Sequence, residues 1–272
     1  MEFASRYVSK NPNSQGIIEY TPEENAVWGE LFERQQQLLP GRACDEYLHG
    51  LKVLNLNKHA IPQLTDTSKV LSHASGWSVV QVPALIPARH FFELLADRKF
   101  PAATFIRTRE EMDYVKEPDI FHELFGHCPL LTEPVYADFV NEYAKRVLTM
   151  QEDDWPLLQR FFWFTVEFGL INTTAGVRAY GGGILSSINE TVYSVESPKP
   201  NRIPFDPITI LRTPYRIDML QAVYFVIDSY QQLYDFLKLD LSDLLEQARK
   251  LGELAPTFPV DENNPNIHIH AC

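Results

Sequence analysis

The sequence has few cysteines, a shortage of basic residues and no long apolar run, and each absence excludes a class of protein. Only three of the 272 residues are cysteines, they lie far apart, and none forms a C-x-x-C pair. This pattern excludes a disulfide framework and a zinc knuckle, and it favours the reducing cytoplasm. Basic residues number 24 against 36 acidic ones, for a net charge of -12. A chain this acidic disfavours a phosphate-backbone partner, so we expect no nucleic acid to bind.

Long apolar segments and export signals are also missing. No run approaches the roughly 20 apolar residues that span a bilayer, and the N-terminus has no basic region followed by an apolar core. We therefore expect a cytoplasmic protein without a membrane partner. The three glycines at 181–183 lack the spacing of a phosphate loop, and the sequence has no Ser-His-Asp or Cys-His pattern of a nucleophilic enzyme.

The periodicity that is present predicts a mainly α protein with short strands, of the α+β class. Thr21, Pro22 and Glu24 have the spacing of a capping box, which begins a helix that stops at Pro40. Apolar β-branched stretches predict strands at 77–82, 103–106 and 224–227, whereas loops are expected at 180–183 and 196–216 and a strand-like tail at 267–270. Further helices are expected at about 44–51, after 62, and at 87–96, 135–148, 154–168, 229–237 and 241–251.

The most informative stretch is 117–129, where two histidines lie five residues apart in an apolar frame. In the zinc-protease motif the second histidine follows at i+4, and the glutamate next to the first is the general base. Here His122-Glu123 is followed by His127 at i+5, which an ideal α helix would rotate about 140° away. For both imidazoles to bind one metal ion, the helix must end or distort between them. Gly126 permits such a break, and Pro129 opposes continuation of the helix.

A third ligand is predicted in the run 161–168. This run is apolar all round apart from Thr165 and Glu167, which indicates a core helix. A carboxylate is costly to bury there unless it is paired or binds a metal. Two histidines and one carboxylate, with other positions open, are typical of non-haem Fe(II) oxygenases. The alternative is an ion pair between Glu167 and a core arginine such as Arg178.

Three segments, 118–127, 163–169 and 179–187, together resemble the catalytic domain of the aromatic amino acid hydroxylases, most closely the bacterial phenylalanine-hydroxylating members. The resemblance implies that family's catalytic-domain fold as a single domain, 1–272, without a separate regulatory or tetramerisation domain. It implies Fe(II) bound by His122, His127 and Glu167, and conversion of L-phenylalanine to L-tyrosine with O2. Tetrahydrobiopterin or a related tetrahydropterin is the implied cosubstrate, and a monomer or homodimer is expected.

The resemblance also implies roles for pocket residues. Arg107 matches an arginine that binds the substrate carboxylate, a task suited to a guanidinium fork; an ordinary surface arginine is the alternative. Ile217 matches a position that is aliphatic in phenylalanine hydroxylases and acidic in tyrosine hydroxylases. Val115 and Phe162 depart from animal members, which carry threonine and tyrosine there. Substrate contacts are implied for Arg107, Tyr114, Val115, Trp163, Ser186 and Ser187, and pterin contacts for Ile86, Phe91, Phe162 and Glu123.

Three other functions remain open on the sequence. Tryptophan 5-hydroxylation is the nearest, because it belongs to the same class of reaction. A zinc hydrolase would use His122 and His127 as ligands and Glu123 as base, and the i+5 spacing argues against it. A metal-stabilised binding protein would hold the same trio in a closed site, although structural zinc sites normally have four protein ligands.

Overall fold

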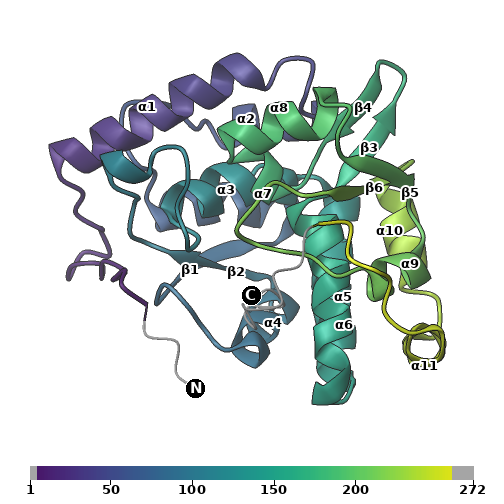
Figure 1. Ribbon diagram of the computed structural model, residues 1–272. Coiled ribbons are helices and arrows are strands. Elements are labelled where there is room, and N and C mark those ends of the chain that lie inside the picture. The colour runs from purple at the N-terminus through teal and green to yellow at the C-terminus, as the bar shows by residue number, and fades with distance from the viewer. Residues whose placement is uncertain (1–4, 259–272) are drawn as a thin grey trace.

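The computed structural model describes residues 5–258, which form a mainly helical protein with two small sheets (Figure 1). The α helices are α1 (Pro22–Leu38), α2 (Asp45–Val53), α3 (Leu64–Ser75), α4 (Ala88–Ala96), α5 (Pro134–Thr149), α6 (Trp155–Phe162), α7 (Gly182–Leu185), α8 (Ile188–Glu196), α9 (Pro207–Arg212), α10 (Tyr230–Phe236) and α11 (Leu241–Leu251). The strands are β1 (Ser78–Val82), β2 (Lys99–Ala103), β3 (Leu170–Thr173), β4 (Gly176–Ala179), β5 (Asn201–Pro204) and β6 (Val223–Ile227). Two π-helical turns, η2 (His122–His127) and η5 (Trp163–Glu167), complete the elements that matter for the site. The predicted α+β class is confirmed.

The start of α1 shows how local sequence sets an element boundary. Thr21 Oγ1 accepts a hydrogen bond from Glu24 N at 3.2 Å, and Glu24 Oε2 accepts one from Thr21 N at 2.7 Å. Both bonds of the predicted capping box are therefore present, and Pro22 occupies the first turn, where its missing N–H costs nothing.

The sheets are short and separate. β1 and β2 are parallel, with Ser78 opposite Lys99, and α4 connects them. The second sheet has the order β4-β3-β6-β5, in which β3 pairs antiparallel with β4 and parallel with β6. Its strand β6 is buried along its whole length, as the apolar run at 224–227 predicted.

Proline explains two errors in the predicted strands. The strand expected at 103–106 lies earlier, at β2, which contains Pro101. Proline lacks a backbone donor and so argues against a strand, except at a sheet edge. Within the described chain β2 pairs only with β1, and β5, which ends at Pro204, is the edge strand of the larger sheet. Part of the loop predicted at 196–216 is therefore an edge strand.

Two helices also replace predicted loops. Within 196–216, Asp206 Oδ2 accepts from Thr209 N at 2.8 Å and caps α9, which begins with Pro207. Within 180–183, α7 begins at Gly182. The β3–β4 hairpin was not predicted, because strands of four residues give too little alternation to detect. The strand-like tail predicted at 267–270 lies outside the described residues.

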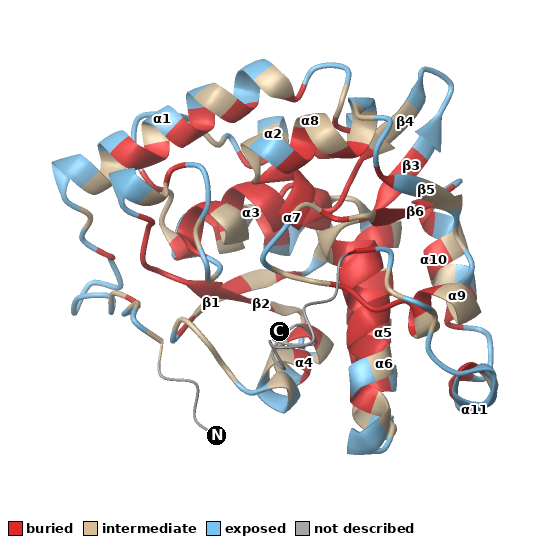
Figure 2. Ribbon diagram, viewed as in Figure 1, coloured by how far each residue is buried: buried red, intermediate tan, exposed pale blue. Residues whose placement is uncertain are grey.

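One hydrophobic core runs through the described chain, from residues of α1 to residues of α11. Figure 2 shows buried residues concentrated along α5, α6 and the inner turns around α7. The short helix α7 packs against both η2 and η5, so the two π-helical turns meet at the centre of the molecule. None of the helices in residues 5–258 is both long and apolar enough to cross a membrane.

Candidate metal centre and substrate pocket

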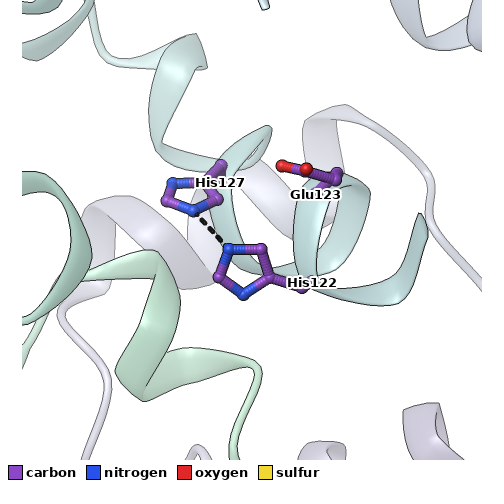
Figure 3. A group of neighbouring side chains, drawn as sticks. All are labelled: His122, Glu123 and His127. Atoms are coloured by element: carbon purple, nitrogen blue, oxygen red, sulfur yellow. Dashed lines mark hydrogen bonds between the residues drawn. The ribbon is translucent and has the colours of Figure 1, made fainter. Parts of the chain in front are cut away.

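The segment that carries the two histidines is a π helix. Its wider turn returns the residue at i+5 towards the face of the first, so His122 and His127 converge without a helix end. The ring centroids lie 4.7 Å apart with the planes at 76° (Figure 3). The predicted distortion is therefore confirmed, but the chain stays helical through Cys128 and Pro129, both of which keep right-handed helical angles.

Glu167 ends the second π-helical turn. Phe168 N donates to Trp163 O at 2.8 Å, a bond that spans five residues and marks the wider turn. Arg178, the alternative ion-pair partner, donates instead to the carbonyl oxygens of Val177 and Ala175 in its own hairpin. The alternative ion pair between Glu167 and Arg178 is therefore not formed.

Three ligand atoms converge between these turns. His122 Nε2 lies 3.0 Å from His127 Nε2. The Glu167 carboxylate reaches both, with Oε1 3.2 Å from His127 Nε2 and Oε2 3.6 Å from His122 Nε2. Atoms about 2.1 Å from one ion are about 3.0 Å apart at right angles and about 3.4 Å apart at tetrahedral angles. The trio therefore fits a single transition-metal ion without rearrangement.

Glu123 is a second carboxylate close to the histidines. One of its carboxylate oxygens lies within 4.8 Å of a ring nitrogen of each histidine, and Figure 3 shows Glu123 beside them on the same helix. Burial, then the carboxylates of Glu167 and Asp119, raise the pKa of Glu123 well above its usual value. Burial would also raise the pKa of Glu167, but His127 and His122 lower it overall. Glu167 is therefore the better anionic ligand, because it is nearer to both imidazoles and favours its charged form.

The trio is partly exposed. The side chains of His122 and Glu167 each keep 16% exposure, whereas that of His127 keeps 3%. Burial lowers the pKa of His122 to about 4, against the opposing effect of Glu167, so the imidazole is neutral at physiological pH and can use a ring nitrogen as a ligand. A partly exposed site suits catalysis better than a fully buried structural site.

Ser186 fixes the ring of His122. Its Oγ donates to Gly182 O at 2.8 Å and lies 2.9 Å from His122 Nδ1. Because the hydroxyl donates its proton to the carbonyl oxygen of Gly182, it must accept from His122, so Nδ1 carries the imidazole proton. Nε2 of His122 then keeps a lone pair that can bind a metal ion. Ser186 was predicted as a substrate contact, and in the structure its hydroxyl contacts the candidate ligand His122. Ser187, predicted likewise, caps α8 by accepting from Glu190 N at 3.3 Å.

The consecutive glycines allow α7 to approach the trio. A Cβ at Gly182 would lie 2.4 Å from His127 Nδ1, and one at Gly181 would lie 2.3 Å from Glu167 O. A Cβ at Gly126 would lie 2.7 Å from Gly182 O. The glycine spacing therefore serves close packing, and Gly126 does not end the helix as the sequence suggested.

Arg107 is buried and held by Asp119. Its Nε and Nη2 donate to the two oxygens of Asp119, both at 2.8 Å, and Arg107 N donates to Oδ2 at 3.0 Å. Asp119 Oδ1 also accepts from His122 N at 3.0 Å. Among residues 5–258 no acceptor contacts Arg107 Nη1, which leaves that end of the guanidinium available. The alternative of an ordinary surface arginine is excluded by its burial.

The predicted aromatic side of the pocket contains Trp163. Its ring stacks on Tyr215 with centroids 4.3 Å apart, and Phe168 lies 4.5 Å away. Tyr114 is 55% exposed, and its hydroxyl lies 3.5 Å from Ile217 O on the facing loop. Val115, beside it, is half-buried.

The predicted pterin contacts lie around α4 and α6. Phe91 is half-buried and meets Phe162 edge to face at 5.3 Å. Phe162 is buried, and Ile86, just before α4, is half-buried. On α4 the inward, buried position is taken by Phe92, and Phe91 lies beside it at the edge of the core.

Two residues of this region were missed from the sequence. Asp119 lies three residues before His122, inside the stretch already singled out, and a buried carboxylate beside a predicted arginine could have identified it. Gln221 is buried and bonds to Trp163, but no sequence signal connects residues so far apart along the chain.

Comparison with known proteins gives consistent matches. A family described as biopterin-dependent aromatic amino acid hydroxylase matches residues 2–247. The phenylalanine-4-hydroxylase of Pseudomonas aeruginosa is 49% identical, over 94% of this chain and 97% of its own. A solved phenylalanine hydroxylase from Legionella pneumophila is 64% identical, with a TM-score of 0.91, covering 93% of this chain and all of that one. Another, from Chromobacterium violaceum with bound Fe(III), is 45% identical, with a TM-score of 0.85 and coverage of 90% and 89%.

Proposed function

Because the chain belongs to the biopterin-dependent aromatic amino acid hydroxylase family, we propose that it converts L-phenylalanine to L-tyrosine with O2 and a tetrahydropterin. The observation that carries this function is the convergence of His122, His127 and Glu167 in a partly exposed site, an arrangement that suits Fe(II). Iron and tetrahydropterin, when bound, supply the activation of O2. The chain's own residues bind and orient the amino acid and exclude water from the site.

We assign the metal ligands to His122, His127 and Glu167. Ser186 orients His122 through its Nδ1, and Gly182 lets α7 press against His127. Both contacts orient the imidazoles in the absence of a metal ion. Groups that surround metal ligands commonly have this role. A zinc hydrolase with Glu123 as base is less well supported, because the motif of that class places the second histidine at i+4 and here it lies at i+5.

We assign the substrate carboxylate to Arg107. Asp119 binds two of the three guanidinium nitrogens of Arg107, which fixes the plane of the guanidinium group. The third nitrogen, Nη1, lies in that plane and is available to the substrate. A pre-oriented donor loses little freedom on binding an amino acid. Since Asp119 also accepts from His122 N, the bound amino acid would have a defined position relative to the trio.

The aromatic ring of the substrate would lie against Trp163, with Ile217 and Tyr114 at the mouth. Val115, Ser186 and Ser187 stay proposed for this side of the pocket, and Ile86, Phe91, Phe162 and Glu123 for the pterin side. Stacked and edge-to-face aromatic groups bind planar rings well and exclude water. Ile217 is aliphatic, which suits the apolar ring of phenylalanine.

The test is a reconstitution of the reaction. The purified protein would be loaded with Fe(II) without oxygen, then given O2, tetrahydrobiopterin and L-phenylalanine, with tyrosine measured by chromatography. We expect tyrosine only when all four components are present. L-Tryptophan in place of L-phenylalanine tests 5-hydroxylation. If neither amino acid is hydroxylated and no oxygen is consumed, the proposed function is wrong.

Three further proposals concern the whole chain. Residues 1–272 act as a single catalytic domain, supported by the continuous core in the described part. The protein is a monomer or homodimer, which sedimentation equilibrium would decide. It works in the cytoplasm, for which the free, buried thiols of Cys44 and Cys128 are suited.

A further inference from the structure

A buried glutamine joins the two sides of the proposed substrate pocket. Gln221 is 4% exposed. Its Oε1 accepts a hydrogen bond from Trp163 Nε1 at 3.0 Å. Its Nε2 donates to the carbonyl oxygens of Arg216 at 2.8 Å and Met219 at 3.3 Å. Both donors of the amide and its oxygen are therefore engaged.

The backbone of Gln221 is fixed as well. Its N–H donates to Glu190 Oε1 at 3.0 Å, and the same oxygen accepts from the hydroxyl of Tyr224. Glu190 belongs to α8 and Tyr224 to β6, and both are buried. Gln221 therefore cannot shift without losing its hydrogen bond to Glu190, which Tyr224 holds in place.

Gln221 determines the orientation of the Trp163 ring. Tyr215 stacks on this ring at 15°, and Phe168 lies against it. Stacking alone lets a ring slide or turn in its plane, whereas a hydrogen bond at the single N–H of indole fixes that rotation. The side of the pocket formed by Trp163 is thus set by a residue outside it.

The same amide closes the loop 216–221. By bonding to Arg216 O and Met219 O it holds both ends of the turn that carries Ile217. Ile217 O in turn lies 3.5 Å from the Tyr114 hydroxyl across the pocket mouth. One side chain therefore bonds both to Trp163 and to the loop that carries Ile217.

We propose that Gln221 is a positioning residue that determines selectivity among aromatic amino acids, an inference that rests on the proposed function. The amide of Gln221 connects the indole N–H of Trp163 to the loop that carries Ile217. On this proposal the phenyl ring of phenylalanine binds with these hydrogen bonds intact, whereas the larger indole of tryptophan displaces Trp163 or the loop and breaks one of them. Loss of the amide relaxes that discrimination.

The test compares wild type with Gln221→Met, which keeps the length of the side chain and removes its hydrogen bonds. The matched control is Gln35→Met. Gln35 is also a buried amide, donating to Leu185 O at 2.6 Å and Thr191 Oγ1 at 3.0 Å, but it touches neither Trp163 nor the loop. We expect Gln221→Met to lower kcat/KM for phenylalanine about three- to tenfold, mainly through KM. The preference for phenylalanine over tryptophan should fall by a similar factor, while Gln35→Met keeps the wild-type preference.

A second readout does not depend on turnover. Subtracting the tryptophan fluorescence spectrum of Trp163→Phe from that of wild type isolates the emission of Trp163. The same subtraction is made for Gln221→Met and for Gln35→Met, each against its own double variant with Trp163→Phe. The emission of Trp163 should shift in Gln221→Met but not in Gln35→Met. If Gln221→Met does not fold, Gln221→Asn keeps the amide on a shorter arm and should show smaller changes of the same sign. In a double-mutant cycle, Gln221→Met should add little to the KM of Trp163→Phe.

The outcomes separate the two proposals. Equal losses of stability in Gln221→Met and Gln35→Met, with the preference and the emission of Trp163 unchanged, would make Gln221 a purely structural residue and overturn the inference. If the wild type forms no tyrosine, the proposed function fails instead. The emission difference still tests whether Gln221 orients Trp163 in that case.

Discussion

At the scale of single residues, Arg107 and Asp119 show how buried charges are held as a pair. Arg107 and Asp119 form a two-bonded pair in the interior. Burial raises the pKa of Asp119, but Arg107 outweighs burial and lowers it overall. Breaking such a pair leaves an uncompensated buried charge, which is strongly destabilising. The pair is retained, in this account, because it aims a guanidinium at the substrate carboxylate.

The first prediction concerns Arg107→Lys. Lysine keeps the positive charge but cannot hold Asp119 with two parallel bonds and present a further N–H in the same plane. We expect the KM for phenylalanine to rise about tenfold or more, and the KM for tetrahydropterin to change by less than about twofold. Steady-state kinetics with each substrate varied in turn would measure both.

The control for that experiment is Arg109→Lys. Arg109 lies two residues further on, is exposed, and pairs with Glu23 and Glu30 on α1. It should leave both KM values unchanged. An unaltered KM for phenylalanine in Arg107→Lys would remove Arg107 from the proposed role.

The second prediction concerns the pH dependence of stability at Glu190. Burial raises the pKa of Glu190, opposed by hydrogen bonds from Tyr224 and the Gln221 N–H. A carboxyl whose folded pKa exceeds its unfolded value of about 4.3 binds its proton more tightly in the folded state. Stability is therefore lost as the pH rises from the unfolded pKa through the folded one.

Glu190→Gln removes that titration. We expect the free energy of unfolding of wild type to fall relative to Glu190→Gln as the pH rises above about 4.3, in urea denaturation at a series of pH values. Parallel curves for the two proteins would show that Glu190 has no shifted pKa.

At the scale of secondary-structure elements, the site depends on two π-helical turns. An α helix would place His122 and His127 on different faces, and η2 brings them to one. The second turn, η5, ends with Glu167. π-helical turns are rare in proteins overall, but those that occur are often found at functional sites. Here the wider turn allows two histidines at i and i+5 to bind one metal ion.

Some features of these elements could be predicted from the sequence, and others could not. The need for a distortion followed from the i+5 spacing, and Glu167 followed from its position in an apolar run. The form of the distortion could not be predicted, because it depends on α7 packing against η2 through Gly126 and Gly182. Edge strands with Pro101 or Pro204 were missed because sheet position, which makes proline tolerable, is not visible in a local pattern.

The third prediction tests the contact between α7 and the trio. Gly182→Ala places a methyl group 2.4 Å from the ring of His127, too close for either to keep its position. We expect Fe(II) affinity to fall at least about tenfold, because a misplaced ligand no longer converges with the others. Isothermal titration of the metal-free protein would measure the affinity.

Gly16→Ala is the control for strain alone. Gly16 has a φ of +77° and open space around its Cα, so alanine should cost about 1 kcal/mol of stability without affecting iron. If Gly182→Ala binds iron as tightly as wild type, the close approach of α7 does not position His127.

At the scale of the whole molecule, the site is assembled from segments far apart in the chain. Arg107 precedes η2, Glu167 follows α6, and Gln221 precedes β6, yet all belong to or border one core. Figure 1 shows α7 at the centre of this arrangement, between the half containing α1 to α3 and the half containing α5 and α6. Long-range packing therefore holds the trio together, and no single segment could form it alone.

The most direct test is the iron content of purified protein after anaerobic Fe(II) loading, measured for wild type, three alanine variants and Glu123→Gln. The account predicts about one iron per chain in wild type and Glu123→Gln, and less than about 0.1 in His122→Ala, His127→Ala and Glu167→Ala. Circular dichroism would confirm that all five proteins are folded. Full iron in Glu167→Ala together with loss of iron in Glu123→Gln would contradict the account, because the carboxylate ligand would then lie beside His122 and not at the end of η5.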